Sequence, residues 1–130
     1  VAVEDPNDTS SYVGTLSVGE TAIITSGSYQ RYFIGSDGMK YHHIIDPSTG
    51  RPADNDLVSV TIVCEDGTLA DALSTAMFVL GENAALKYWR ENGGFEMIMI
   101  NKDNEIMCTT GLIEVFTLTN RTDYTLKMVE

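Results

Sequence analysis

The sequence predicts a single α+β domain, spanning residues 1–130, in which two consecutive helices pack on a mainly antiparallel sheet. Three observations lead to this prediction. Strand-like runs occupy the first half of the chain, two helical patterns follow between residues 69 and 92, and strand-like runs resume at residue 95. With 130 residues and an apolar share of 43%, the chain is long enough to bury one core.

The first half of the chain contains short runs separated by turn residues. Residues 1–12 are polar and turn-rich and are expected to form a lead-in segment. Residues 21–34 predict a strand pair or a bulged strand, because a Ser-Gly-Ser sequence interrupts a β-branched and apolar pattern. Residues 51–56 are expected to form a polar loop, and residues 57–64 give the strongest strand signal, a central strand covered on at least one side.

The helical block begins after this strand. Thr68 is expected to cap a helix from Leu69 to Leu80. Its predicted apolar stripe contains Leu69, Ala72, Leu73, Ala76, Met77 and Leu80. A more amphipathic helix is expected over residues 82–92, followed by a hairpin of residues 95–100 and 105–110. A last strand is predicted over residues 112–118, before a polar end that is expected to fray.

Composition excludes some classes of function. A net charge of −11 argues against nucleic-acid binding, because phosphates would be repelled. No segment is long enough to span a bilayer. Cys64 and Cys108 lie in strand-like runs without metal-ligand spacing and are interpreted as buried thiols. The chain begins at Val1 without a signal-like run, which suggests a processed product or a piece of something longer.

Both histidines of the chain stand side by side, in a segment that leads into a turn. Alternation places His43 and Ile45 on one face of this extended segment and His42 on the other. In the turn that follows, Asp46 is expected to accept hydrogen bonds from backbone amides and Gly50 to adopt a left-handed conformation. The segment could therefore present a titratable group beside a rigid turn, or simply be a strand end with half-buried histidines.

Three oxygen-bearing side chains interrupt the apolar pattern of the first predicted helix. Asp71 and Thr75 are four residues apart and point the same way from adjacent turns, with Ser74 beside them. Hard oxygens on one helix face suit Mg²⁺, which accepts few protein ligands and keeps waters or phosphates for the rest. Two structural explanations remain open: Asp71 complements the helix dipole, and the hydroxyls bond back to carbonyls one turn earlier.

Three motifs, taken together, resemble a known family. They are residues 25–29 (TSGSY), residues 41–52 (YHHIIDPSTGRP) and residues 70–76 (ADALSTA) with Val79-Leu80-Gly81. In order and spacing they are similar to the C-terminal half of the ApbE-type FAD:protein FMN transferases, formerly named thiamine biosynthesis lipoproteins. The similarity extends from about Val3 to Phe116.

The resemblance implies a Mg²⁺-dependent enzyme that cleaves FAD, releases AMP and links FMN through its phosphate to a Thr or Ser hydroxyl of a target protein. By position, Asp71 and Thr75 match metal ligands, and Ser74 lies where some members supply another. Ile45 matches a position that contacts FAD, through its backbone. His43 matches the motif histidine, a candidate general base or phosphate-orienting group.

The resemblance also sets expectations about partners and location. FAD and a flavinylated redox subunit are the expected partners, and the parent protein is expected to be an extracytoplasmic lipoprotein whose membrane anchor lies outside this chain. Because family members are about twice as long, this chain is expected to be inactive alone and to self-associate. Two alternatives remain: an FAD pyrophosphatase that releases FMN and AMP, or a non-catalytic flavin-binding or structural module.

Overall fold

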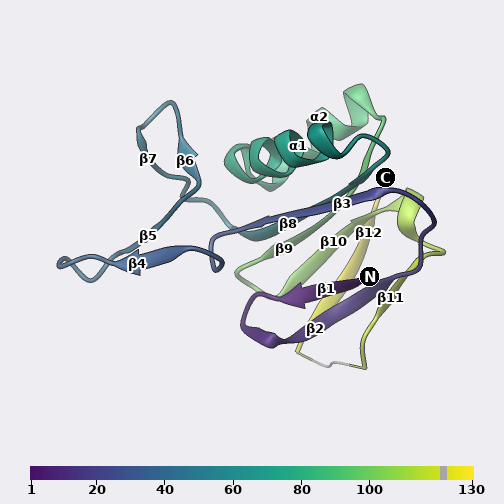
Figure 1. The fold of residues 1–130 in the computed structure, drawn as a ribbon, viewed down its shortest axis with the longest axis horizontal. Helices are drawn as coiled ribbons and strands as arrows, with labels where there is room; N and C mark the ends of the chain where they lie inside the picture. Colours follow the sequence, from purple (N-terminus) through teal and green to yellow (C-terminus); the bar gives the residue numbers. More distant parts are fainter. Residues whose placement is uncertain (121–122) are drawn as a thin grey trace.

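The computed structural model describes residues 1–120 and 123–130, which form three layers (Figure 1). The middle layer is a five-stranded sheet in the order β12-β10-β9-β8-β3. Every neighbouring pair in it is antiparallel except β10 and β12, which are parallel. Its strands are β3 (Ala22–Gly27), β8 (Leu57–Cys64), β9 (Glu96–Asn101), β10 (Glu105–Thr109) and β12 (Thr125–Val129). The predicted α+β class with a mainly antiparallel sheet is confirmed.

A smaller sheet forms the layer opposite the helices, below the five-stranded sheet in Figure 1. It contains β1 (Ala2–Asp5), β2 (Asp8–Leu16) and β11 (Phe116–Leu118), in the order β1-β2-β11. The prediction of a lead-in segment was therefore wrong, because residues 1–16 form a hairpin. The irregular register of this hairpin, between Val3 and Asp5, obscures the alternation that would have marked it.

The two helices cover the other face of the five-stranded sheet. They are α1 (Gly67–Leu80) and α2 (Glu82–Asn92), and Gly81 separates them with a positive φ of 81°. Asp66, rather than Thr68, caps α1, because its carboxylate accepts hydrogen bonds from the Thr68 and Leu69 amides. No helix in the described ranges has the length and apolar character needed to cross a bilayer.

The face of α1 that is buried differs from the predicted stripe. The buried residues of α1 are Ala70, Leu73, Ser74, Met77 and Phe78. Leu69 and Leu80, which were expected in the core, remain about half exposed. The stripe is rotated because the Phe78 side chain is fully buried against the sheet, and because the polar Ser74 finds partners there.

Two apolar clusters hold the layers together. The first lies between the helices and the five-stranded sheet, and the second lies between the two sheets. Strand β8 contributes to both, as a central strand covered on both faces. Leu57 joins the helix-side cluster with Val60 and Ile62, contrary to strict alternation, because the β8–β9 register shifts between Leu57 and Ser59.

An arm projects from the side of the layers at the left of Figure 1. It contains two separate two-stranded sheets, β4 (Tyr32–Ile34) with β5 (Lys40–His42), and β6 (Ile45–Asp46) with β7 (Arg51–Pro52). The predicted strand pair over residues 21–34 is therefore divided, since β3 belongs to the body and β4 to the arm. Residues 51–56, expected to be loop, begin with β7.

The end of the chain is more ordered than its polar sequence predicts. A short 3₁₀ turn (Thr110–Leu112) replaces the start of the strand predicted over residues 112–118, which shortens to β11. The end that was expected to fray contains β12, and the two residues at 121–122 lie outside the described part. Cys64 and Cys108 are buried free thiols, as predicted, and burial raises the pKa of Cys108 to about 12.

Candidate functional site

The histidine segment forms the base of the arm and ends in the expected turn. The Asp46 carboxylate accepts hydrogen bonds from the Ser48 amide at 2.8 Å and the Ser48 hydroxyl at 2.7 Å, which lower the pKa of Asp46. The Gly50 amide donates to the Asp46 carbonyl at 2.8 Å, and Gly50 has a φ of 67°. The turn is therefore fixed by its own residues, as the sequence predicted.

His42 is the structural histidine of the pair. Its Nε2 lies 2.9 Å from the Ala53 carbonyl oxygen, and its Nδ1 lies 3.3 Å from the Ile44 amide nitrogen. Since the Ile44 amide donates, Nδ1 accepts and Nε2 carries the proton that is donated to Ala53. The ring also meets Phe78 edge-on, with centroids 5.7 Å apart, and burial lowers the pKa of His42. His42 therefore fastens the arm to helix α1 as a neutral ring.

His43 points the other way and is exposed. The Arg31 carbonyl oxygen lies 3.3 Å from His43 Nδ1 and also accepts a hydrogen bond from the His43 amide at 3.2 Å. A carbonyl can only accept, so Nδ1 carries the proton in this contact and Nε2 of the neutral ring keeps its lone pair. This tautomer is the one that a general base working through Nε2 requires.

Ile45 lies on the same side of the segment as His43. The residue is 47% exposed, although it belongs to strand β6 and pairs with Pro52. An exposed isoleucine beside an exposed histidine is compatible with a contact to a ligand. Its contact with FAD stays a prediction.

Asp71 and Thr75 lie on the exposed side of α1, one turn apart. The Asp71 carboxylate has no hydrogen bond or ion pair within the described residues, so its oxygens are free to bind a cation. Phe78, which His42 contacts, lies three residues after Thr75, or about 4.5 Å along the helix axis. His42 therefore contacts α1 one turn from Thr75, whereas the hydrogen bonds of His43 go to Arg31 and not to this helix.

Ser74 is separated from these two side chains. It is fully buried, and its hydroxyl donates to the Asp71 carbonyl at 2.9 Å, the back-bonding that was one structural explanation for it. Its hydroxyl also lies 2.8 Å from that of Ser26 in β3, and the Ser26 oxygen is 3.3 Å from Thr75 Oγ1. Direct binding of a metal by Ser74 stays a prediction.

Ser26 is a neighbour of the candidate site that the sequence reasoning missed, although it lies in the first of the three motifs. Alternation along β3 places Ala22, Ile24 and Ser26 on one face, and the first two pack against the helix-side cluster. A serine in the otherwise apolar row of β3 residues that faces the helix predicts a hydrogen-bonding partner on that helix.

Comparison with known proteins places this arrangement in a family. A model described as "ApbE family" matches residues 1–99. The chain belongs to the ApbE family. Among curated relatives, the FAD:protein FMN transferase of Treponema pallidum is 40% identical over 115 residues, which cover 88% of this chain and 32% of the relative. That of Vibrio cholerae is 40% identical over 106 residues, which cover 81% of this chain and 31% of the relative.

Solved structures of ApbE proteins have the same fold. The ApbE protein of Thermotoga maritima superposes with a TM-score of 0.74 at 39% identity, covering 88% of this chain and 37% of that protein. The flavin transferase ApbE of Vibrio cholerae gives a TM-score of 0.65 at 32% identity, covering 95% of this chain and 36% of that protein. The present chain thus spans about a third of the length of the curated relatives it matches, rather than the expected half.

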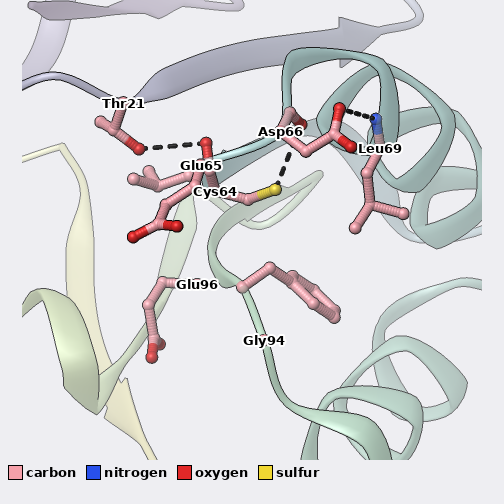
Figure 2. A pocket seen from close by; sticks show the side chains of 9 residues that line it. Thr21, Cys64, Glu65, Asp66, Leu69, Gly94 and Glu96 are labelled. Atoms are coloured by element: carbon pink, nitrogen blue, oxygen red, sulfur yellow. Dashed lines mark hydrogen bonds between the residues drawn. The ribbon is translucent and has the colours of Figure 1, made fainter.

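A hollow elsewhere in this ApbE-family chain does not coincide with the predicted site. It lies beside the N-terminal end of α1 (Figure 2), and its volume is about 460 Å³. Glu65, Asp66 and Glu96 give it an acidic lining that would repel a diphosphate. The complete lining consists of Thr21, Val63, Cys64, Glu65, Asp66, Leu69, Gly94, Phe95 and Glu96.

Proposed function

We propose that this chain forms part of an FAD:protein FMN transferase, and that it supplies the general base and two metal ligands. The observation that carries the proposal is the exposed His43, whose Nδ1 lies 3.3 Å from the Arg31 carbonyl and whose Nε2 is therefore left as an acceptor. The curated relatives that bear this activity are about three times as long, so the proposal concerns the whole protein.

The reaction assigns a specific task to His43. The hydroxyl oxygen of a Thr or Ser on the acceptor protein attacks the phosphorus of the FMN half of FAD. A new P–O bond forms, the bond to the AMP phosphate breaks, and AMP leaves with the bonding electrons. Nε2 of the neutral His43 takes the proton of the attacking hydroxyl, which near neutral pH is a task suited to an imidazole.

A divalent cation is implied by the family resemblance, and the chemistry of the exposed oxygens fits Mg²⁺. Asp71 offers a carboxylate that has no partner among residues 1–120 and 123–130, and Thr75 offers a hydroxyl one turn later. Mg²⁺ bound there would neutralise charge on the diphosphate and on the departing AMP. The described residues contain no group of three or more His, Cys, Asp or Glu side chains placed to bind a metal, so this pair supplies only part of a coordination shell.

The test is Asp71→Ala in the full-length protein, with a target protein, FAD and Mg²⁺. Mass spectrometry of the target measures attached FMN, and chromatography measures free FMN and AMP. We expect FMN attachment to disappear with an unchanged circular dichroism spectrum. Asp103→Ala, which removes an exposed carboxylate from the β9–β10 turn, is the matched control and should retain activity.

Two results would contradict the proposal. Parent-level FMN attachment by Asp71→Ala would show that Asp71 is not a ligand. Release of free FMN and AMP by the parent protein, with no FMN on any target, would instead identify an FAD pyrophosphatase that uses the same residues with water as acceptor.

A further inference from the structure

We propose that Ser26 is a positioning residue that turns the lone pairs of the Thr75 hydroxyl toward the metal. Ser26 touches neither substrate nor metal in this proposal and acts through Thr75 alone. The inference rests on the proposed function, because it takes Asp71 and Thr75 as the ligands of a divalent cation.

Three hydroxyls form a continuous chain of hydrogen bonds between β3 and α1. Thr75 Oγ1 lies 3.3 Å from Ser26 Oγ, and Ser26 Oγ lies 2.8 Å from Ser74 Oγ. Ser74 Oγ in turn donates to the carbonyl oxygen of Asp71 at 2.9 Å. The chain therefore begins at one candidate ligand and ends on the backbone of the other.

The direction of this chain follows from counting protons. Each hydroxyl has one proton, and the Ser74 proton is committed to the Asp71 carbonyl, which can only accept. Ser26 must therefore donate to Ser74, which leaves the Ser26 oxygen as an acceptor. Thr75 then donates to Ser26, and the remaining lone pairs of Thr75 Oγ1 are left for a ligand on the exposed side.

This direction is the one that a metal ligand requires. A hydroxyl that coordinates a cation must keep its own proton away from the positive charge, so an acceptor behind the hydroxyl prepares it for binding. Burial keeps that acceptor in place, since Ser26 is 9% exposed and Ser74 fully buried. The β3–β8 pairing fixes the backbone of Ser26 opposite Val60. The Thr75 hydroxyl is thereby oriented before any metal arrives.

A purely structural role would also account for two buried, hydrogen-bonded serines, so a matched comparison is needed. Strand β3 provides it one residue earlier. Thr25 Oγ1 lies 2.8 Å from Thr61 Oγ1 in β8 and, within the described part of the chain, makes no hydrogen bond to α1. Removing the Thr25 hydroxyl deletes a bond of the same type from the same strand, and leaves the chain that leads to Thr75 untouched.

The experiment measures Mn²⁺ binding to the full-length protein without FAD, by the electron paramagnetic resonance signal of free Mn²⁺. Ser26→Ala is expected to weaken binding about tenfold or more, the usual effect of losing a partner behind a metal ligand. Ser26→Thr, which keeps the hydroxyl, should bind Mn²⁺ more tightly than Ser26→Ala and close to the parent. Thr25→Val should bind as the parent does, and thermal unfolding of each variant records any loss of stability.

Ser74→Ala provides a second test that remains valid if Ser26→Ala does not fold. Without Ser74 the Ser26 proton is free to turn toward Thr75, and the Thr75 proton is then forced outward, so Mn²⁺ binding should weaken by a similar factor. Asp71→Ala must lose Mn²⁺ binding for the comparison to be valid. Given that loss, parent-like Mn²⁺ binding by Ser26→Ala would overturn the positioning role. If Ser26→Ala does not fold, parent-like binding by Ser74→Ala would overturn it. Parent-like binding by Asp71→Ala would instead overturn the metal site itself.

Discussion

Replacing each histidine separately by alanine should have different effects: His42→Ala should lower stability, and His43→Ala should lower activity. His42 makes two hydrogen bonds, to the Ala53 carbonyl at 2.9 Å and from the Ile44 amide at 3.3 Å. Each contributes about 1 kcal/mol, and the edge-on contact with Phe78 adds roughly 0.5–1.5 kcal/mol. His42→Ala should therefore lower the free energy of unfolding by about 2–3 kcal/mol, since the second bond is long and the ring is only partly buried.

His43→Ala should have the opposite profile. The side chain is exposed and its single hydrogen bond, 3.3 Å to the Arg31 carbonyl, is long, so the free energy of unfolding should change by less than about 0.5 kcal/mol. Turnover should fall by roughly two to four orders of magnitude, because that is the usual contribution of a general acid–base group. His42→Ala should cost far less activity at temperatures where the variant remains folded.

The assays are denaturant unfolding of the full-length protein and the initial rate of FMN attachment at saturating FAD. Unfolding and activity must be measured on the same preparations, so that a folded but inactive variant is recognised. Equal activity losses for the two variants, or a loss confined to His42→Ala, would refute the assigned roles. A His43→Ala variant as unstable as His42→Ala would refute the derived geometry of the segment.

Two further predictions follow from the arm. Because burial lowers the pKa of His42 below its ordinary 6.5, the contribution of this residue to stability should be complete above about pH 6.5 and be lost as pH falls through the lower folded pKa. The free energy of unfolding, measured from pH 8 to pH 5, should show this loss in the parent. If it depends on pH in His42→Ala as it does in the parent, the prediction is wrong. The isolated 130-residue chain should self-associate through Tyr32, Phe33, Ile34 and Met39, which are more than half exposed on the β4–β5 hairpin. Light scattering should show oligomers that Phe33→Asp disperses, and a monomer at all concentrations would exclude this surface.

Elements with a clear hydrophobic periodicity or a clear turn motif could be predicted from the sequence. Strand β8, both helices, the β9–β10 hairpin and the Asp46–Gly50 turn all follow from local patterns, and alternation correctly separated His42 from His43. Prediction failed where tertiary contacts override the local pattern. Strand β12 looked like a polar end because only pairing with β10 makes it a strand.

The sequence named the candidate site residues but not the hydrogen bonds that they make. Motif spacing marked His43, Asp71 and Thr75 as candidates, all three are exposed in the structure, and their roles stay predictions. The burial of Ser74 could not be read from helical spacing, because it depends on Ser26, which is 48 residues away in the chain. The hydrogen bond from His43 to the Arg31 carbonyl could not be predicted either, because every residue type has the same backbone acceptor.

The two sheets are completed by C-terminal strands, which limits how far the chain can fold while it is being synthesised. Strand β11 pairs Phe116 with Leu16, and β12 pairs with β10 in parallel. A ribosome that has completed β2 must therefore add about a hundred more residues before that strand receives its second neighbour. Until then the apolar face of the β1–β2 hairpin and one edge of β10 are available to other nascent chains. Premature termination before Phe116 would consequently yield a product prone to aggregate, and chaperones that act during translation have a defined interval in which to bind it.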